Sequence, residues 1–259
     1  MRLHFLGTGT SFGIPVIGCD CPTCASSDPR DRRTRHGALL ESDDGARRVL
    51  VDTPPELRLQ LVRAGIGRVD AVWFTHCHAD HTHGVDDLRA FSIRGAPLLA
   101  YAGDDCLQIL FSRFQYVFDP EWRPPEGITK PNVRLQPLQS GCLVDVAGFP
   151  MLPLRVPHGE DSAYGFRVGE LGYVTDAKSL PADTRAALRG VRVLVLNALW
   201  FGRTHPSHFT VEEAVAVAQE IGAERTFLTH LTHRLRHADL LDRLPAGIEP
   251  AYDGLVIQI

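Results

Sequence analysis

The sequence predicts an α/β fold in which two similar layers of strands and helices pack face to face. Short apolar runs rich in β-branched residues recur along the chain, and several end in a polar residue, which is typical of strands in α/β proteins. Stretches with apolar residues at helical spacing follow these runs. The pattern of β-rich stretches followed by helices occurs in both halves, so we expect each half to supply one layer.

The composition is that of an ordinary globular domain. Hydrophobic residues make up 44% and charged residues 22% of the sequence. We expect residues 1–259 to form a single domain, because no low-complexity segment or flexible linker interrupts the pattern. With a formal net charge of -4, the sequence lacks the excess of positive charge that attracts long nucleic acids, so we do not expect such a partner.

The compartment expected from the sequence is the cytoplasm. Residues 1–7 run straight into a strand-like segment without the features of a signal peptide. No apolar run approaches the roughly eighteen residues that a membrane span needs, so we expect no membrane partner. The six cysteines are not spaced like a disulfide framework, which favours a reducing compartment.

A glycine-rich turn and a few helices are expected between the strands of the first half. The turn covers residues 7–15 and fits neither a P-loop nor a dinucleotide fingerprint, so we expect it to bring the backbone close to a functional site. Pro54 and Pro55 favour a helix start, and Gly65 favours its end. The predicted elements are strands at 3–6, 37–42, 47–51, 70–75 and 98–101 and helices at 56–63, 84–91 and 104–114.

The second half is richer in strands. Residues 116–131, which are rich in aromatic residues and prolines, precede it as an irregular insertion. This insertion is equally compatible with a pocket wall, a dimer contact and simple packing. The predicted elements after it are strands at 132–138, 142–146, 151–156, 163–168, 171–175, 192–197, 226–229 and 255–259 and a helix at 210–221.

Residues 76–81, His-Cys-His-Ala-Asp-His, carry the most informative motif. They follow the buried strand predicted at 70–75, and the alternation of a strand places His76 and His78 on one face. Asp80 and His81 follow on the turn. Three imidazoles and a carboxylate within six residues are the ligands that a divalent transition metal prefers, so the motif predicts a metal site rather than a histidine-rich loop.

Further polar residues stand where other strands finish, which is the place where α/β proteins keep their chemistry. His158 and Asp176 follow two strands of the second half, and His230 follows a third together with His233. These residues can supply the ligands that the first motif lacks.

A second cluster consists of Cys19, Cys21 and Cys24 in the loop at 18–25. Three thiolates at this spacing suit Zn²⁺, but a structural zinc is almost always four-coordinate, so one ligand is missing locally. Three free cysteines and a redox pair are the alternatives, although nothing nearby resembles a redox helix.

Other charged residues have less specific interpretations. The basic run at 29–36 is compatible with an anionic substrate or with a solvated loop. We expect His4, His36 and His237 to be structural or to face solvent, and His83 to lie behind the metal motif or at the surface.

The motif from Thr75 to Gly84, followed in order by strand-end His158, Asp176 and His230, resembles that of the metallo-β-lactamase superfamily. The resemblance runs from Leu3 to the last strand and implies a four-layer αββα sandwich with a dinuclear metal site at one edge. It implies the following ligands: His76, His78 and His158 for one metal, Asp80, His81 and His230 for the other, and Asp176 as the bridge. Asp52 matches the acidic residue that orients a ligand from behind.

Within the superfamily, the cysteine loop together with His230-x-x-His233 is similar to the PhnP group of cyclic phosphodiesterases. That likeness implies a structural zinc held by the three cysteines and His233, and a homodimer. It also places an extra catalytic histidine at His208, while His205 three residues earlier keeps this assignment open. The PqqB group shares the cysteines, but the intact His-x-His-x-Asp-His motif points to a hydrolase.

The resemblance implies an enzyme, a metal-dependent phosphodiesterase. Its expected partners are small cyclic phosphates such as phosphoribosyl 1,2-cyclic phosphate or 2′,3′-cyclic nucleotides. Two divalent metals, zinc or manganese with iron or nickel as alternatives, can share a water and lower its pKa to form the nucleophile. Asp80 and His208 are the expected catalytic residues, and His208 suits proton delivery to the leaving oxygen.

Three other functions remain open. The same ligands serve thioester and lactone hydrolases of the glyoxalase II type, in which the metals polarise a carbonyl. A tRNA 3′-processing nuclease is less compatible with the acidic charge. The third is a non-catalytic protein of the PqqB type, which uses the fold as a scaffold. Loss of a metal ligand would favour this interpretation, and the sequence does not show such a loss.

Overall fold

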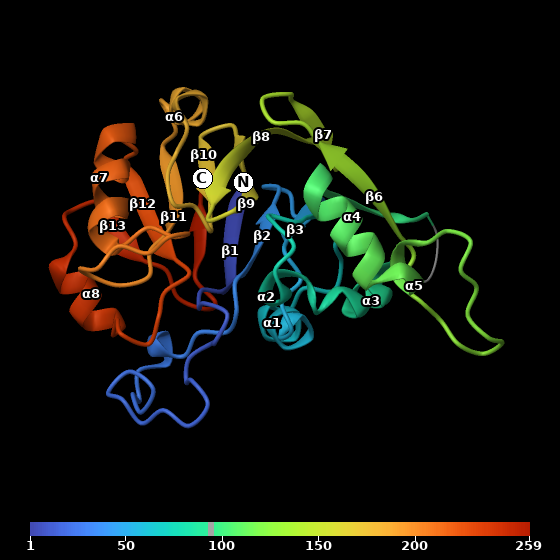
Figure 1. The fold of residues 1–259 in the computed structure, drawn as a ribbon, viewed down its shortest axis with the longest axis horizontal. Helices are drawn as coiled ribbons and strands as arrows, with labels where there is room; N and C mark the ends of the chain where they lie inside the picture. Colours follow the sequence, from blue (N-terminus) through green and yellow to red (C-terminus); the bar gives the residue numbers. More distant parts are fainter. Residues whose placement is uncertain (93–95) are drawn as a thin grey trace.

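The computed structural model describes residues 1–92 and 96–259, which form two seven-stranded sheets packed face to face with helices on both outer faces (Figure 1). This confirms the predicted αββα sandwich. The first sheet contains, in spatial order, β14 (Val256–Gln258), β1 (Arg2–Gly7), β2 (Gly37–Glu41), β3 (Arg48–Val51), β4 (Ala71–Trp73), β5 (Leu98–Gly103) and β6 (Val133–Leu138). The second contains β13 (Ile248–Pro250), β12 (Arg225–Thr229), β11 (Val193–Asn197), β10 (Leu171–Val174), β9 (Asp161–Val168), β8 (Phe149–His158) and β7 (Val144–Val146).

Alternation along the strands divides the apolar residues between an inner and an outer core. In β1, Leu3 and Phe5 point between the sheets, where Trp73 and Phe166 also lie. Leu39 of β2 faces the helices on the outer side of the first sheet. Trp73 Nε1 donates a hydrogen bond of 2.8 Å to the Tyr164 carbonyl, so the two sheets are joined by a polar contact as well as by packing.

Strands β3 to β6 run parallel to one another, and so do strands β10 to β13. Parallel strands share one edge of the sheet for their carboxyl ends. The polar residues that the sequence places at strand ends are therefore brought to a common edge in each sheet.

The helices of the first half lie where the sequence predicts them, except near the histidine motif. The helix expected at 84–91 is divided into the 3₁₀ helix η2 (Val85–Leu88) and the short helix α3 (Arg89–Ser92). The motif itself contains α2 (Ala79–Thr82) where we expected a turn. The expected helices at 56–63 and 104–114 are α1 (Leu57–Ala64) and α4 (Asp104–Arg113), and Gly65 ends α1 with a φ of 66°.

The insertion at 116–131 begins as the helix α5 (Gln115–Phe118) and is otherwise irregular, as expected. Its irregular part projects from the body of the molecule as a light-green loop in Figure 1. Lys130 lies over the Trp122 ring at 5.7 Å.

The second half contains short elements that periodicity did not indicate. They are α6 (Ala182–Leu188), α8 (His237–Arg243) and strand β13. In the first half, the 3₁₀ helix η1 (Pro29–Asp31) was likewise not expected. The expected helix at 210–221 is α7 (Val211–Ile221), which a capping box of Thr210 and Glu213 begins. Among the described residues, none of the helices has the length and apolar character required to cross a bilayer.

Candidate dinuclear metal centre

Strand ends from both sheets place the predicted ligands at one edge of the sandwich. Asp52 follows β3, and the segment from Thr75 to His76 follows β4 in the first sheet. In the second sheet, Asp176 follows β10 and His230 follows β12, while β8 ends at His158 itself. Residues far apart in the sequence thus meet because the strands that carry them end together.

Three of these residues have a left-handed backbone conformation. Asp52, Asp176 and His230 have φ values of 63°, 55° and 56°. Non-glycine residues rarely adopt this region, which costs on the order of 1 kcal/mol each. Asp52 and His230 directly follow a strand, and Asp176 lies two residues after one, so the unusual φ turns the chain where the side chain joins the site.

The first group of candidate ligands contains His76, His78 and His158. His78 Nδ1 lies 3.0 Å from His76 Nε2 and 3.3 Å from His158 Nε2. The other nitrogen of His158, Nδ1, donates to the Ser207 carbonyl at 3.0 Å, which leaves Nε2 free to bind a metal. Three imidazole nitrogens that converge at these distances offer lone pairs to a shared cation, so their arrangement fits a metal ion.

The second group contains Asp80, His81 and His230, whose ligand atoms also lie close together. Asp80 Oδ2 is 3.4 Å from His81 Nε2 and 3.8 Å from His230 Nε2. Asp176 lies between the two groups, with Oδ1 3.1 Å from His230 Nε2 and Oδ2 3.6 Å from His81 Nε2. It forms a further cluster with His76 and His81, as the implied bridging position requires.

The electrostatics and hydrogen bonding of this edge fit divalent metals. The buried atoms His81 Nε2 and His230 Nε2 have no hydrogen-bond partner among the described residues. Although burial disfavours its charge, the carboxylates of Asp176, Asp52 and Asp80 raise the pKa of His81 well above its ordinary value. A buried group of carboxylates and imidazoles requires positive charge, and this donor set accepts zinc, manganese, iron or nickel.

Asp52 holds His81 from behind. Burial alone would raise the pKa of its carboxyl, but His81 and His36 keep that pKa well below the usual value. Asp52 Oδ2 lies 2.6 Å from His81 Nδ1, and Thr75 donates to Asp52 from its amide at 2.7 Å and its hydroxyl at 2.8 Å. The hydrogen bond to the carboxylate places a proton on His81 Nδ1. It also orients the ring so that Nε2 faces the candidate metal ligands.

His36 is part of this arrangement, and sequence reasoning missed it. Its side chain is fully buried, and Nδ1 lies 3.0 Å from Asp52 Oδ2. His36 stands alone before β2 in the basic run, so no spacing or motif distinguishes it from a surface histidine. Of the two environments that we expected, structural and solvent-facing, the structure shows the buried one.

His208, rather than His205, contacts the candidate metal ligands. His208 Nε2 lies 3.0 Å from Asp176 Oδ1, and its ring packs 4.7 Å from that of His158. His205 Nδ1 lies behind it, 3.3 Å from His208 Nδ1, and its ring contacts Trp200. Burial lowers the pKa of His208 to about 4. The catalytic role of His208 stays a prediction.

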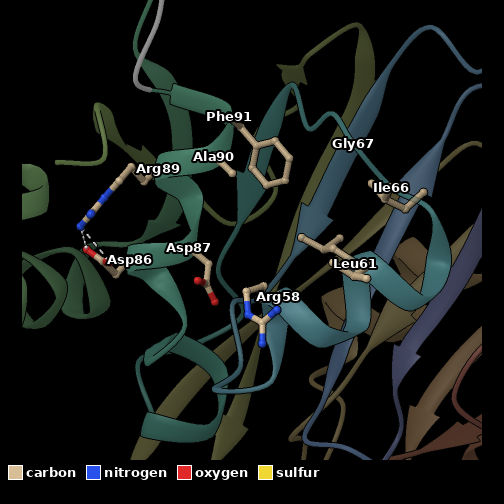
Figure 2. Close-up of a pocket in the computed structure, with 10 residues that line it drawn as sticks. Arg58, Leu61, Ile66, Gly67, Asp86, Asp87, Arg89, Ala90 and Phe91 are labelled. Carbon is tan, nitrogen blue, oxygen red and sulfur yellow. Dashed lines mark hydrogen bonds and ion pairs between the residues drawn. The ribbon is translucent and has the colours of Figure 1, made fainter. Parts of the chain in front are cut away.

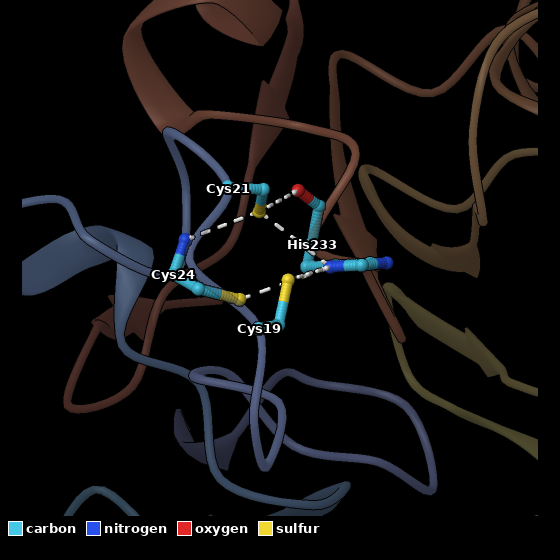
Figure 3. A group of neighbouring side chains, drawn as sticks. All are labelled: Cys19, Cys21, Cys24 and His233. Atoms are coloured by element: carbon cyan, nitrogen blue, oxygen red, sulfur yellow. Dashed lines mark hydrogen bonds between the residues drawn. The ribbon is translucent and has the colours of Figure 1, made fainter.

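The cysteine loop and His233 form a separate cluster, shown in Figure 3. His233 Nδ1 lies 3.3 Å from Cys19 Sγ, 3.6 Å from Cys21 Sγ and 3.7 Å from Cys24 Sγ. The amide of Cys24 donates to Cys21 Sγ, and this hydrogen bond lowers the pKa of Cys21 to about 6. The four side chains lie close enough to hold one metal ion, and their role as the ligands of a structural zinc stays a prediction.

Residues of the basic run fasten this loop to the second half of the chain. Arg33 is 1% exposed and donates to the Thr232 carbonyl at 3.2 Å. Asp31 contacts Arg33 and accepts a hydrogen bond of 2.6 Å from the His237 amide. The expectation of a substrate-facing or solvated run is therefore wrong for Arg33, which is a buried structural residue.

The glycine-rich turn approaches the site, as expected. A Cβ atom added to Gly9 would lie 2.9 Å from the Arg33 carbonyl oxygen, so only glycine fits there without displacement. The Thr8 carbonyl accepts a hydrogen bond of 2.8 Å from the Leu231 amide, next to His230.

A hollow of about 490 Å³ lies elsewhere, between α1 and α3 (Figure 2). Apolar side chains such as Leu61, Ile66 and Phe91 line it, with Arg58 and Asp87 alongside. Among the described residues that line it there is no histidine or cysteine, so this lining does not offer the chemistry of the metal centre.

The fold and the site define a member of the metallo-β-lactamase superfamily. Residues 47–231 match the family model described as the beta-lactamase superfamily domain, and the chain belongs to this superfamily. Within it, the chain lies close to the PhnP family. It is similar over its whole length to a solved structure described as a new diphosphatase from the PhnP family, with 37% identity, a TM-score of 0.90 and 97% of that chain covered.

Two other relatives show how far the likeness extends. The chain is 38% identical over 256 residues, 98% of its length, to an octanoyltransferase of Porphyromonas gingivalis, but it spans only 51% of that protein. Zn²⁺-bound PqqB from Methylobacterium extorquens shares the fold, with a TM-score of 0.81, 20% identity and 100% of both chains covered. The chain thus spans about half the length of the first of its curated relatives.

Proposed function

We propose that the protein is a metal-dependent phosphodiesterase that cleaves small cyclic phosphodiesters. The observation that carries this proposal is the position of His208, a titratable side chain 3.0 Å from Asp176, the candidate bridging ligand between two groups of metal-binding residues. The likeness to a PhnP-family diphosphatase supports a phosphate substrate.

The residues divide the work of hydrolysis. His76, His78 and His158 would hold one metal, Asp80, His81 and His230 would hold the other, and Asp176 lies between the two groups. Metals bound there would supply Lewis acidity, which lowers the pKa of a water and offsets the charge of phosphoryl oxygens. The buried position of His81 and Asp52 excludes solvent from the back of the centre, so the electrostatic interactions there are strong.

His208 supplies the proton. Burial keeps its imidazole neutral in the free site at neutral pH, with a pKa of about 4. The negative charge of a bound phosphodiester favours the protonated form of a neighbouring imidazole. His208 then donates that proton to the oxygen of the departing alkoxide, a group that leaves poorly without one.

The shape and charge of the site favour a small substrate. The centre is open on the side of His78, whose side chain is 45% exposed and lies 3.4 Å from Asp161 Oδ2. Asp161 is itself well exposed, so this entrance carries negative charge. With a formal net charge of -4, the protein lacks the electrostatic attraction that long nucleic acids require.

A thioester hydrolase is the second candidate. The specific observation in its favour is the octanoyltransferase relative, of which the matching segment makes up about half. The same ligands can polarise a thioester carbonyl. An alkanethiolate leaves without full protonation more readily than an alkoxide, so this reaction depends less on His208.

The decisive experiment compares substrates on protein of known metal content. Turnover of bis(p-nitrophenyl) phosphate, a 2′,3′-cyclic nucleotide, phosphoribosyl 1,2-cyclic phosphate and an octanoyl thioester is measured after loading with zinc or manganese. We expect cleavage of the diesters, with a preference for a cyclic one. Cleavage of the thioester alone would replace the proposal by the second candidate, and absence of turnover with two metals bound to the centre would exclude both.

A further inference from the structure

A chain of four polar side chains crosses the apolar layer between the two sheets behind the candidate metal centre. It begins at the Tyr173 hydroxyl, which lies 2.7 Å from His36 Nε2. His36 Nδ1 lies 3.0 Å from Asp52 Oδ2, and the same oxygen lies 2.6 Å from His81 Nδ1. The chain therefore ends at a histidine whose Nε2 faces the second metal position.

The four residues come from both halves of the sandwich and are inaccessible to water. His36 lies directly before β2 in the first sheet, whereas Tyr173 belongs to β10 in the second. All four are 0% exposed, and the surrounding inter-sheet core is apolar. A polar chain at such a place costs stability unless each member is satisfied, which indicates that its members have a role beyond packing.

The contacts determine where the protons lie. A ring nitrogen that faces a carboxylate oxygen must carry hydrogen, because two lone pairs would otherwise repel each other. His36 Nδ1 is therefore protonated, so Nε2 is an acceptor and the Tyr173 hydroxyl is its donor. The same rule makes His81 Nδ1 a donor to Asp52, so Nε2 is the nitrogen that would bind a metal.

Packing holds the same geometry. The rings of His36 and His81 stack with centroids 4.9 Å apart and an angle of 25° between their planes. Tyr173 in turn stacks on Phe166, with centroids 5.1 Å apart and an angle of 4°. His36 thus restrains both the carboxylate that accepts from His81 and the rotation of the His81 ring.

We propose that Tyr173 and His36 are positioning residues for the second metal, and that they act through Asp52 on the orientation and tautomer of His81. This inference rests on the proposed dinuclear centre. Outer hydrogen-bond partners of metal ligands typically change metal affinity by about 10–100-fold when they are removed, and we expect an effect in this range.

The test measures metal binding without substrate. Tyr173→Phe keeps the ring and removes the donor to His36. Tyr101→Phe is the matched control, because Tyr101 lies in the same inter-sheet core and its hydroxyl contacts the Asp145 carbonyl instead. Chelator competition with zinc gives the affinity of each position, and Co²⁺ absorption reports the geometry of the second.

We expect Tyr173→Phe to weaken the second metal by about 10-fold or more and to leave the Cys₃His metal and the first metal unchanged. In His36→Asn the amide nitrogen can replace Nδ1 at Asp52 but reaches neither Tyr173 nor the stacking position. The affinity of this variant for the second metal should therefore lie between those of wild type and His36→Ala. Affinities equal to those of Tyr101→Phe would overturn the proposal. If the histidine variants do not fold, Tyr173→Phe decides alone.

The outcome is separable from the fate of the proposed function. A wild-type protein that binds both metals but cleaves no diester removes the proposed substrate and leaves this test intact. Conversely, an active diesterase in which Tyr173→Phe binds both metals as tightly as wild type removes only the role of Tyr173 and His36.

Discussion

The two clusters of candidate metal ligands in this molecule are built in opposite ways. Three ligands of the Cys₃His cluster come from one loop at 19–24, and only His233 comes from a distant segment. The ligands of the His/Asp centre come from the ends of strands in both sheets. The cysteines are partly exposed, whereas most ligands of the centre are buried.

This difference separates two ways of using a metal. The loop that carries the cysteines contains no helix or strand between residues 18 and 25, so a metal bound there would cross-link it in place of an apolar core. The His/Asp centre is positioned by the sheets themselves, with carboxylate and hydroxyl groups behind its histidines. We therefore expect damage to the centre to reduce activity at constant stability, and damage to the cysteine loop to do the reverse.

The largest effect on activity is expected for Asp80→Asn, which keeps the shape of a candidate ligand and removes its charge. The loss of one metal should lower kcat/KM for a cyclic diester by at least about 10³-fold. Steady-state kinetics and metal analysis check this, with Asp183→Asn on the exposed side of α6 as the control. Near-normal activity with both metals retained would contradict the ligand assignment.

The next effect is expected for His208→Ala. Removing a general acid typically costs about 10²–10⁴-fold, and we expect a loss of at least about 10²-fold for a diester with an alkoxide leaving group. The loss should be much smaller for a p-nitrophenyl ester, because p-nitrophenolate leaves without a proton. His205→Ala is the control, and full activity of His208→Ala on the unactivated diester would refute the role.

A smaller effect on activity but a clear effect on stability is expected for Cys21→Ser. The metal content should fall by one per chain, and the free energy of unfolding should decrease by on the order of 4 kcal/mol. Activity at saturating metal should fall by less than about tenfold. Denaturant unfolding and metal analysis test this against Cys142→Ser, an exposed cysteine. A collapse of activity would show that the two clusters are coupled through the turn from His230 to His233.

The smallest effect concerns pH and His237, which packs beside the cysteine loop. Burial, with the charges of Arg30 and Arg33, lowers the pKa of His237 from 6.5 to about 4. Between these pH values the unfolded chain binds a proton that the folded chain does not, so the free energy of unfolding falls as the pH drops and levels off below about pH 4.

His237→Gln removes this contribution, which is on the order of 2 kcal/mol. The difference in unfolding free energy between wild type and variant should therefore change from pH 7 to pH 4, as denaturant titrations at several pH values can show. His83→Gln, at an exposed histidine, should follow the wild type. Parallel curves for His237→Gln and wild type would contradict this assignment.

The sequence allows most of the fold and the candidate ligands to be predicted, because these depend on local signals. Apolar periodicity marks the long strands, and the run from His76 to His81 is itself a ligand pattern. Short elements such as α6 and β13 escaped because their few residues show no clear period and are fixed by tertiary packing.

The residues behind the site could not be predicted for a different reason. Tyr173 lies in an apolar strand and His36 in a basic run, and their meeting depends on the register and spacing of two sheets. Likewise, the buried position of Arg33 follows from the docking of the cysteine loop on Thr232. Such contacts join segments that carry no mutual signal in the sequence.

The left-handed conformations of Asp52, Asp176 and His230 have a consequence for how the protein can be altered. Glycine relieves the strain of a positive φ, so on backbone grounds alone a glycine at each position favours the folded chain. At Asp52 the opposite effect is larger, because a glycine there would leave the Thr75 amide, the Thr75 hydroxyl and His81 Nδ1 without the buried acceptor that they share. The folded chain therefore tolerates the left-handed turn at Asp52 because the hydrogen bonds of its carboxylate offset the backbone strain.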